Sequence, residues 1–250
     1  MTVASRASRA QGIVLRGRIL GEADRIVTLL TRERGKLDAV AKGVRRPGSR
    51  LAGRLEFGCE VTLGLHRGRN LETIVSADIV RAHWTEIVDP GAFATAQLCL
   101  ELVDAFCEPD LAVPGVYALV TGFLDALGGA LAPAVLVPRF TLRLLGTLGY
   151  APASDGCLHC GDPLVDAAAW ADIEAGGLAC AACRPHRAGE LALERADVAN
   201  FRALGAVAGG PARATARATP AAARAVESFL RWHLGKRPRA SQVFAELAHP

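Results

Sequence analysis

The sequence predicts an α+β protein in which a five-stranded N-terminal β-barrel precedes an α-helical domain with an inserted four-cysteine module. Three observations lead to this fold class. Short apolar runs rich in β-branched residues, separated by turn residues, fall before residue 83. After residue 89 apolar residues recur every three or four positions, which is typical of helices. Four cysteines form two CxxC pairs in the C-terminal half. We therefore expect a barrel domain over 1–82, a helical domain over 83–250 and a cysteine module over 155–187.

The predicted strands cover residues 11–20, 25–31, 36–42, 59–66 and 71–80. Turn residues separate them, and Gly35 is available for a positive φ between the second and third strands. Strand number and spacing fit a small closed or nearly closed antiparallel sheet. A five-stranded Greek-key barrel that binds oligonucleotides has this form. Periodicity alone does not separate it from other small barrels.

Helical spacing follows in the rest of the chain, over residues 92–107, 113–127, 134–148, 197–208, 221–234 and 241–247. Residues 111–138 hold a single Asp, Glu, Lys or Arg, namely Asp125, and so invite comparison with a membrane span. A spanning helix needs about 20 uninterrupted apolar residues. Pro114, Gly128, Gly129 and Pro133 interrupt this stretch, which favours two buried helices around a Gly-Gly turn.

Positive charge is concentrated in the first third of the chain. Residues 1–81 contain 16 Lys and Arg against 8 Asp and Glu, whereas residues 82–250 contain 13 against 17. The segment Lys42–Arg54 carries five cations, no acid and several helix-breaking glycines and a proline, so it is predicted to be a basic loop. Such a loop attracts polyanions, and a solvated loop without function is the alternative.

Two further basic turns join this loop as candidates, because several loops of one small barrel could converge on a single face and follow a phosphate backbone. Only Phe57 and Trp84 are nearby for base stacking, which predicts sequence-independent and salt-sensitive binding. The candidate binding residues are Arg32, Arg34, Lys36, Lys42, Arg45, Arg46, Arg50, Arg54, Arg67 and Arg69.

The four clustered cysteines are the most specific motif in the chain. Cys157 and Cys160 form one CxxC pair, and Cys180 and Cys183 form a second pair after nineteen residues. Two such pairs at this spacing indicate a structural Zn²⁺ site, because each tight turn presents two thiolates and two turns complete a tetrahedron. We expect His159 and His186 to be bystanders. The remaining cysteines, 59, 99 and 107, are expected to be buried free thiols, which suits a reducing cytoplasm.

Enzyme motifs are missing from the sequence. It contains no phosphate-binding GxxxxGK[ST], no GxSxG and no HExxH. The carboxylates Asp24, Glu33 and Asp38 each stand near an Arg or Lys and do not form a recognisable acid–base pair. A four-cysteine site also leaves no coordination position open for catalysis. We therefore predict a protein that is not an enzyme.

The segment Gly12–Gly58 resembles the N-terminal domain of the bacterial RecO family of DNA-repair recombination mediators, through its order GEADRIVTLLT…GK…AKGVRR…SR. Residues 230–247, LRWHLGKRPRASQVFAEL, resemble the closing segment of the same family. The resemblance implies an N-terminal OB-fold barrel, a helical domain and a zinc module. It also implies binding to single- and double-stranded DNA, annealing of complementary strands, and a location in the cytoplasm with the nucleoid.

The implied partners are RecR, the single-stranded-DNA-binding protein (SSB) and, through them, RecA. In the family the acidic tail of SSB binds the helical domain, and Arg139 and Arg143 are the candidates for that contact here. Two alternatives stay open. A zinc-containing enzyme that processes nucleic acid would need an open metal position, and an adaptor that binds only protein would show no salt-dependent DNA binding.

Overall fold

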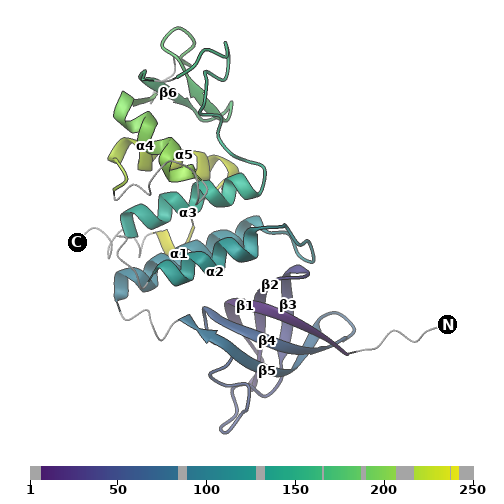
Figure 1. The fold of residues 1–250 in the computed structure, drawn as a ribbon. Helices are drawn as coiled ribbons and strands as arrows, with labels where there is room; N and C mark the ends of the chain where they lie inside the picture. Colours follow the sequence, from purple (N-terminus) through teal and green to yellow (C-terminus); the bar gives the residue numbers. More distant parts are fainter. Residues whose placement is uncertain are drawn as a thin grey trace, which may run out of the picture. The chain divides into compact units, whose positions relative to one another are not determined.

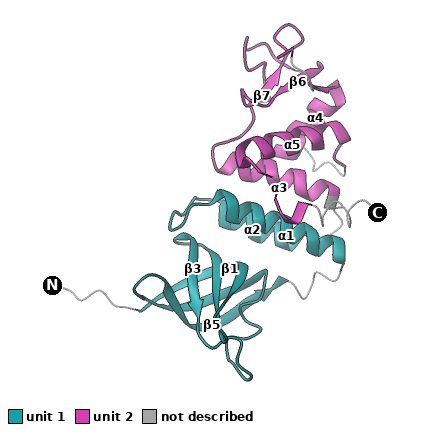
Figure 2. Cartoon of the chain, turned by 180° about the vertical axis from the view of Figure 1, so that it is seen from behind, with its two compact units in different colours: residues 1–128 teal, residues 129–250 magenta. Residues whose placement is uncertain are grey.

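The computed structural model describes residues 7–83, 89–127, 133–164, 166–186, 190–206, 217–236 and 238–241 (Figure 1). The chain forms two compact units, residues 1–128 and 129–250 (Figure 2). The first unit contains the barrel and two helices, and the second contains three helices and the cysteine module. None of the described helices is both long and apolar enough to cross a membrane.

Five strands form the N-terminal barrel, as the sequence predicts: β1 (Ala7–Leu20), β2 (Asp24–Thr31), β3 (Gly35–Ala41), β4 (Cys59–His66) and β5 (Glu72–Ala82). They pair in the order β1-β2-β3-β5-β4, and β4 pairs back onto β1 to close the barrel. Alternate residues of β4, Val61, Leu63 and Leu65, point into the core, which is the period expected of a strand with one buried face.

Two details of the barrel differ from the predicted antiparallel sheet. β3 and β5 pair in parallel, and only through Ala39 with Glu72 and Val40 with Thr73. β1 begins at Ala7 rather than Gln11, because its first residues pair with the end of β4, where Ala7 lies opposite His66. Sequence periodicity misses both details, since they depend on which strands meet rather than on the residues of one strand.

Helices α1 (Pro90–Phe106) and α2 (Val116–Ala126) complete the first unit. The side chain of Asp89 caps α1 by accepting a hydrogen bond from the backbone N–H of Ala92 at 2.7 Å. The α2 residue Tyr117 donates its hydroxyl to Glu60 of β4 at 2.8 Å. Gln11 of β1 donates its side-chain amide to the same carboxylate at 2.8 Å, so α2 is joined to two strands through one acidic group.

The second unit is built on α3 (Pro133–Thr147), α4 (Arg195–Gly205) and α5 (Pro220–Leu234). A three-stranded sheet of β6 (Ala169–Asp172), β7 (Gly177–Ala179) and β8 (Leu191–Leu193) packs with them around Phe201 and Phe229. The five predicted helices from 92 to 234 are confirmed to within three residues at each end. The predicted Gly-Gly turn and Trp84 lie outside the described residues, as does all of the predicted helix 241–247 after Ser241.

Candidate nucleic-acid interface and metal site

The basic loop between β3 and β4, residues 42–58, is a chain of tight turns held at both ends. Val44 and Leu55 point inward and are buried in the barrel core. Each contributes roughly 1.5–3 kcal/mol of burial as an upper bound. The backbone N–H of Gly43, where φ is +63°, donates to Asp24 at 2.7 Å, and that of Gly58 donates to Val14 at 3.0 Å. The loop is therefore anchored, and its polar residues face outward.

The cations of this loop differ in how far their charge is neutralised. Lys42, Arg46 and Arg50 are exposed and have no ion-pair partner among the described residues. Arg45 donates only to the backbone carbonyls of Gly21 and Glu22, at 3.4 and 3.0 Å, which leaves its charge uncompensated. Arg54 is different.

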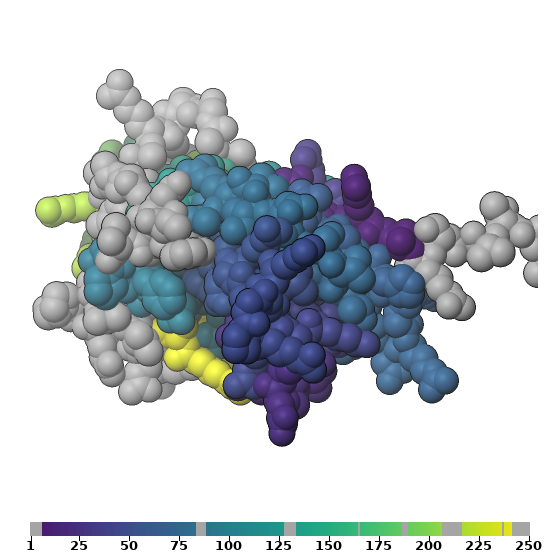
Figure 3. Space-filling model, turned by 90° about the horizontal axis from the view of Figure 1, so that it is seen from below, coloured from purple at the N-terminus to yellow at the C-terminus, as the bar shows by residue number. Residues whose placement is uncertain are grey.

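Arg54 donates to the carbonyl of Ala77 at 2.7 Å and pairs with Asp78 at 3.0 Å. The loop thus presents four uncompensated cations, which we call the loop cations: Lys42, Arg45, Arg46 and Arg50. Figure 3 looks onto this side of the barrel, and the dark blue segment that contains the loop stands at the centre of the view with side chains extending from it.

The β2–β3 turn holds the predicted residues Arg32, Arg34 and Lys36, and it lies at the other end of its hairpin. Arg25 pairs with Ala41 at one end of β2–β3, and Thr31 pairs with Gly35 at the other. Six residues of strand separate these ends, which corresponds to roughly 20 Å. The predicted convergence of all basic loops on one face is therefore not what the barrel topology produces.

Two cations of the β2–β3 turn attach the barrel to α1 and to the segment between α1 and α2. Arg34 contacts both oxygens of Glu72 at 3.0 Å and pairs with Asp110 at 3.0 Å. Partial burial alone would lower the pKa of Arg34, but these two carboxylates outweigh it and raise that pKa. Lys36 donates from Nζ to the carbonyl oxygen of Asp104 at 2.5 Å and lies 3.5 Å from the carboxylate of Asp104. Arg32 remains exposed and unpaired among the described residues.

The β4–β5 turn carries Arg67 and Arg69, which are exposed and have no ion-pair partner in the described part of the chain. The turn belongs to the same end of the barrel as the β2–β3 turn, because Glu72 directly after it bonds Arg34. Arg9 is exposed on β1 opposite Gly64 and adds a cation that our sequence prediction missed. An earlier start for β1 would have pointed to it.

The aromatic residue of the basic loop packs against a ring of α1. Phe57, predicted as a stacking residue, packs edge-to-face against Phe93 of α1 with ring centroids 5.5 Å apart. Phe57 is thus only partly exposed, although Phe93 itself is 39% exposed, and the cations outnumber the rings on this surface, which favours contact with phosphates over contact with bases.

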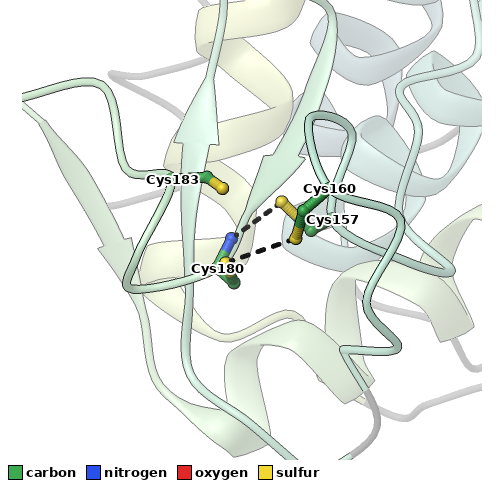
Figure 4. Close-up of side chains that lie close together, drawn as sticks. All are labelled: Cys157, Cys160, Cys180 and Cys183. Atoms are coloured by element: carbon green, nitrogen blue, oxygen red, sulfur yellow. Dashed lines mark hydrogen bonds between the residues drawn. The ribbon is translucent and has the colours of Figure 1, made fainter.

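The four predicted ligand cysteines come together at one point of the second unit (Figure 4). Their sulfur atoms all lie within 4.8 Å of one another, and the sulfurs of Cys160 and Cys180 are 3.8 Å apart. A tetrahedral site with metal–sulfur bonds of about 2.3 Å separates its sulfurs by about 3.8 Å. The spacing of the four thiols therefore fits a metal ion bound tetrahedrally by four sulfur atoms.

Tight turns and short strands position these cysteines. In the first knuckle the N–H of Gly161 donates to the carbonyl of Cys157 at 2.8 Å, and in the second the N–H of Cys183 donates to that of Cys180 at 3.1 Å. Burial opposes ionisation of Cys157, but backbone N–H groups of Cys160, Cys180 and His159 that point at its sulfur lower its pKa to about 6. The lowered pKa favours the thiolate form of Cys157, which is the form that binds metal ions.

The two nearby histidines stand outside this cluster. His159 lies with Nε2 3.0 Å from the carboxylate of Asp172, and Nδ1 of His186 accepts a hydrogen bond from Arg184 at 3.3 Å. The clustered ligand set in the described chain is the four cysteines alone. The other cysteines, 59, 99 and 107, are buried and form no disulfide, as predicted.

Arg139 and Arg143 project from α3, one turn apart. The Nη1 atom of Arg139 is buried and has no hydrogen-bond partner in the part of the chain that the structure describes. Burial, followed by repulsion from Arg143, lowers the pKa of Arg139. An unpaired buried guanidinium nitrogen beside a second cation is a favourable place for an anion.

Comparison with known proteins matches both parts of the chain to one family. Residues 5–83 match the family model "Recombination protein O N terminal", and residues 88–242 match "Recombination protein O C terminal". The DNA repair protein RecO of Frankia casuarinae is 37% identical over 239 residues, which cover 93% of this chain and 96% of that protein. The protein of the same name from Nocardioides sp. is 37% identical over 234 residues, covering 90% and 94%. That of Heliobacterium modesticaldum is 42% identical over 195 residues, covering 75% and 69%. The chain belongs to the recombination protein O (RecO) family of DNA repair proteins.

Proposed function

We propose that this protein is a DNA-binding recombination mediator that is not an enzyme. It would anneal complementary single strands and, with RecR, help to load RecA onto strands coated by SSB, in the cytoplasm at the nucleoid. The observation that carries the proposal is the set of four uncompensated loop cations, held outward by a loop whose Val44 and Leu55 are buried in the barrel core. Membership of the RecO family supports the choice of DNA as the polyanion.

The mechanism is electrostatic. Two complementary strands repel each other through their phosphates, and a cluster of fixed cations lowers that repulsion while the bases pair. If the four loop cations each neutralise one phosphate of a single strand, log K falls by about 3 for each tenfold rise in salt. Arg32, Arg67 and Arg69 would extend the contact. Arg34, Lys36 and Arg54 would contribute less, because acidic or carbonyl groups already hold them.

The test is a full-length variant in which Lys42, Arg45, Arg46 and Arg50 are all replaced by Ala. We expect ATP-independent annealing to be lost and the slope of log K against log salt for single-strand binding to fall by about 3, with the remaining slope due to cations outside the loop. A matched control replaces both Arg25 and Glu56 by Gln, which removes a surface ion pair at 3.1 Å without changing net charge. Unchanged annealing and salt dependence in the quadruple variant would refute the assignment.

We further propose that the four cysteines hold a structural Zn²⁺. Four sulfur ligands complete the tetrahedron and leave no position for a reactive water, which supports a structural role over a catalytic one. Replacement by Co²⁺ should give a tetrathiolate absorption spectrum. A spectrum with an oxygen ligand would instead favour a nucleic-acid-processing enzyme.

For the acidic tail of SSB we propose Arg139 and Arg143 as the contact. A carboxylate of the tail would give the buried Nη1 of Arg139 the hydrogen-bond partner it lacks among the described residues. Arg139→Ala should weaken binding of a peptide with the tail sequence and leave single-strand DNA binding unchanged. Equal peptide affinity in the variant and the parent protein would place the contact elsewhere.

A further inference from the structure

Trp232, near the C-terminal end of α5, and Tyr150, three residues after α3, are exposed aromatic residues of the second unit. The chain has only three Trp and two Tyr residues. Two of these five, Trp232 and Tyr150, are 53% and 50% exposed. Large rings normally bury most of their surface in a core, so two exposed rings in one unit indicate a binding surface.

These rings stand on rigid supports. α5 is capped by Thr219, whose side chain accepts from the N–H of Ala222, and its inner face is buried through Val226 and Phe229. His233 follows Trp232 on α5, and its ring lies 5.1 Å from the ring of Tyr150 at an interplanar angle of 41°. The backbone N–H of Tyr150 donates to the carbonyl of Leu145 at 2.7 Å, which fixes the Tyr150 backbone against the end of α3. The Tyr150 ring, held against His233, can bind a flat partner with little loss of side-chain entropy.

The charged residues next to Trp232 in the chain are positive. Arg231 directly precedes Trp232, and Lys236 follows it by four residues. Lys236 is exposed and has no ion-pair partner among the described residues, and Arg231 lies only loosely against Glu227, at 3.8 Å. Cations beside exposed aromatic rings are the combination found in proteins that bind single-stranded nucleic acid. An acidic peptide would use the charges but would leave the ring faces without matching partners.

We infer that Tyr150, Trp232, His233 and Lys236, here called the α5 surface, bind unpaired bases of single-stranded DNA by stacking. This is a second DNA site on the chain, in the unit that does not contain the basic loop. The two sites recognise different features of DNA. The loop cations neutralise phosphates, which both single strands and duplexes offer, whereas the α5 surface needs base faces, which a duplex hides inside its stack.

A base stacked on a ring keeps its hydrogen-bonding edge free. A strand held by its bases at the α5 surface therefore stays able to pair with a complementary strand. One chain could thus hold one strand through its phosphates and present a second strand with its bases ordered. That arrangement favours annealing over mere coating of DNA.

The first test uses tryptophan fluorescence of the full-length chain. Replacing Trp84 and Trp170 by Phe leaves Trp232 as the only tryptophan. Titration with oligothymidine should quench its emission, and a duplex of equal length should not. Quenching by neither DNA, or equal quenching by both, would overturn the inference.

The second test measures affinity. Trp232→Ala should weaken single-strand binding by about 5- to 150-fold, which corresponds to the loss of one stacked base, and should leave duplex binding unchanged. The slope of log K against log salt should stay the same, because no cation is removed, whereas Lys236→Ala should reduce that slope by about 0.7. Trp232→Phe should retain most of the affinity, since Phe also stacks.

Ile19→Ala is the matched control, because Ile19 is an exposed apolar residue of the barrel and should not affect DNA binding. If the α5 surface binds a protein instead, Trp232→Ala will leave single-strand affinity unchanged, and the inference fails. That outcome is separate from failure of the proposed function, which the loop variant alone decides. The loop variant changes salt dependence, and the Trp232 variant does not.

Discussion

Gly35 allows the β2–β3 turn to meet the segment after α1, and Gly35→Ala should break that contact. A Cβ atom at Gly35 would lie 2.0 Å from the carbonyl oxygen of Leu111 and 2.4 Å from its carbonyl carbon. Both neighbours are backbone atoms, so no side-chain rotation relieves the clash. The chain must move apart there, and the hydrogen bond from the N–H of Asp110 to the carbonyl of Lys36, at 2.8 Å, is lost.

The expected magnitude has two parts. Gly35 has φ of +72°, and a left-handed conformation costs a residue with a Cβ about 1–2 kcal/mol. Loss of the Asp110–Lys36 hydrogen bond costs about 0.5–1.5 kcal/mol. A total of roughly 2.5 kcal/mol lowers the melting temperature of a 128-residue unit by about 9 °C, at an unfolding entropy of about 2.1 cal/mol/K per residue.

Differential scanning calorimetry of the full-length protein would measure this shift. Gly48→Ala is the matched control, because Gly48 has φ of +76° and nothing within 4 Å of the added Cβ. The control carries the backbone strain without the clash and should lose about half as much. If the Gly35 variant melts within about 2 °C of the Gly48 variant, the reasoning about close backbone contact is wrong.

Three other outcomes follow from the contacts described above. Tyr117→Phe removes the hydroxyl that donates to Glu60 and should lower the free energy of unfolding, measured by urea titration, by about 1.5–3 kcal/mol. An unchanged free energy would mean that water fully replaces the Tyr117 hydroxyl as the donor to Glu60. Cys180→Ser should abolish tetrathiolate metal binding and lower the melting temperature of the second unit, measured by metal stoichiometry and calorimetry; a variant that keeps full metal content would contradict the four-cysteine site. Arg50→Ala should reduce the salt slope of single-strand binding by about 0.7, and Arg54→Ala should reduce it less, because Asp78 already compensates Arg54; equal slopes would contradict this ranking.

Local patterns in the sequence predict the elements of this fold well. β4 begins and ends as predicted at Cys59 and His66, because alternating apolar residues and flanking glycines mark both ends. The four cysteines were also predictable, since two CxxC pairs at this spacing have few other uses. Signals of this kind lie within one segment of the chain.

Contacts between segments far apart in the chain were not predictable from it. From the sequence we expected Arg34 and Lys36 to be available to bind DNA. In the structure Arg34 is paired with Glu72 and Asp110, and Lys36 with Asp104. Those acids lie 38 to 76 residues away, and no local pattern reports them. The three short strands in and after the cysteine module were missed for a related reason, because β7 and β8 have only three residues each and are defined by pairing with β6.

The construction of the basic loop has a consequence for how such proteins can vary. Val44 and Leu55 fill the barrel core, so they fix where the loop leaves and re-enters the fold. The stretch from Arg45 to Gly48 is fully on the outside and contributes nothing to that core. Its length and composition can change at little cost to stability. The barrel should therefore tolerate changes in this stretch. An insertion after Pro47 could carry a fluorophore site or a foreign recognition peptide while the barrel folds as before.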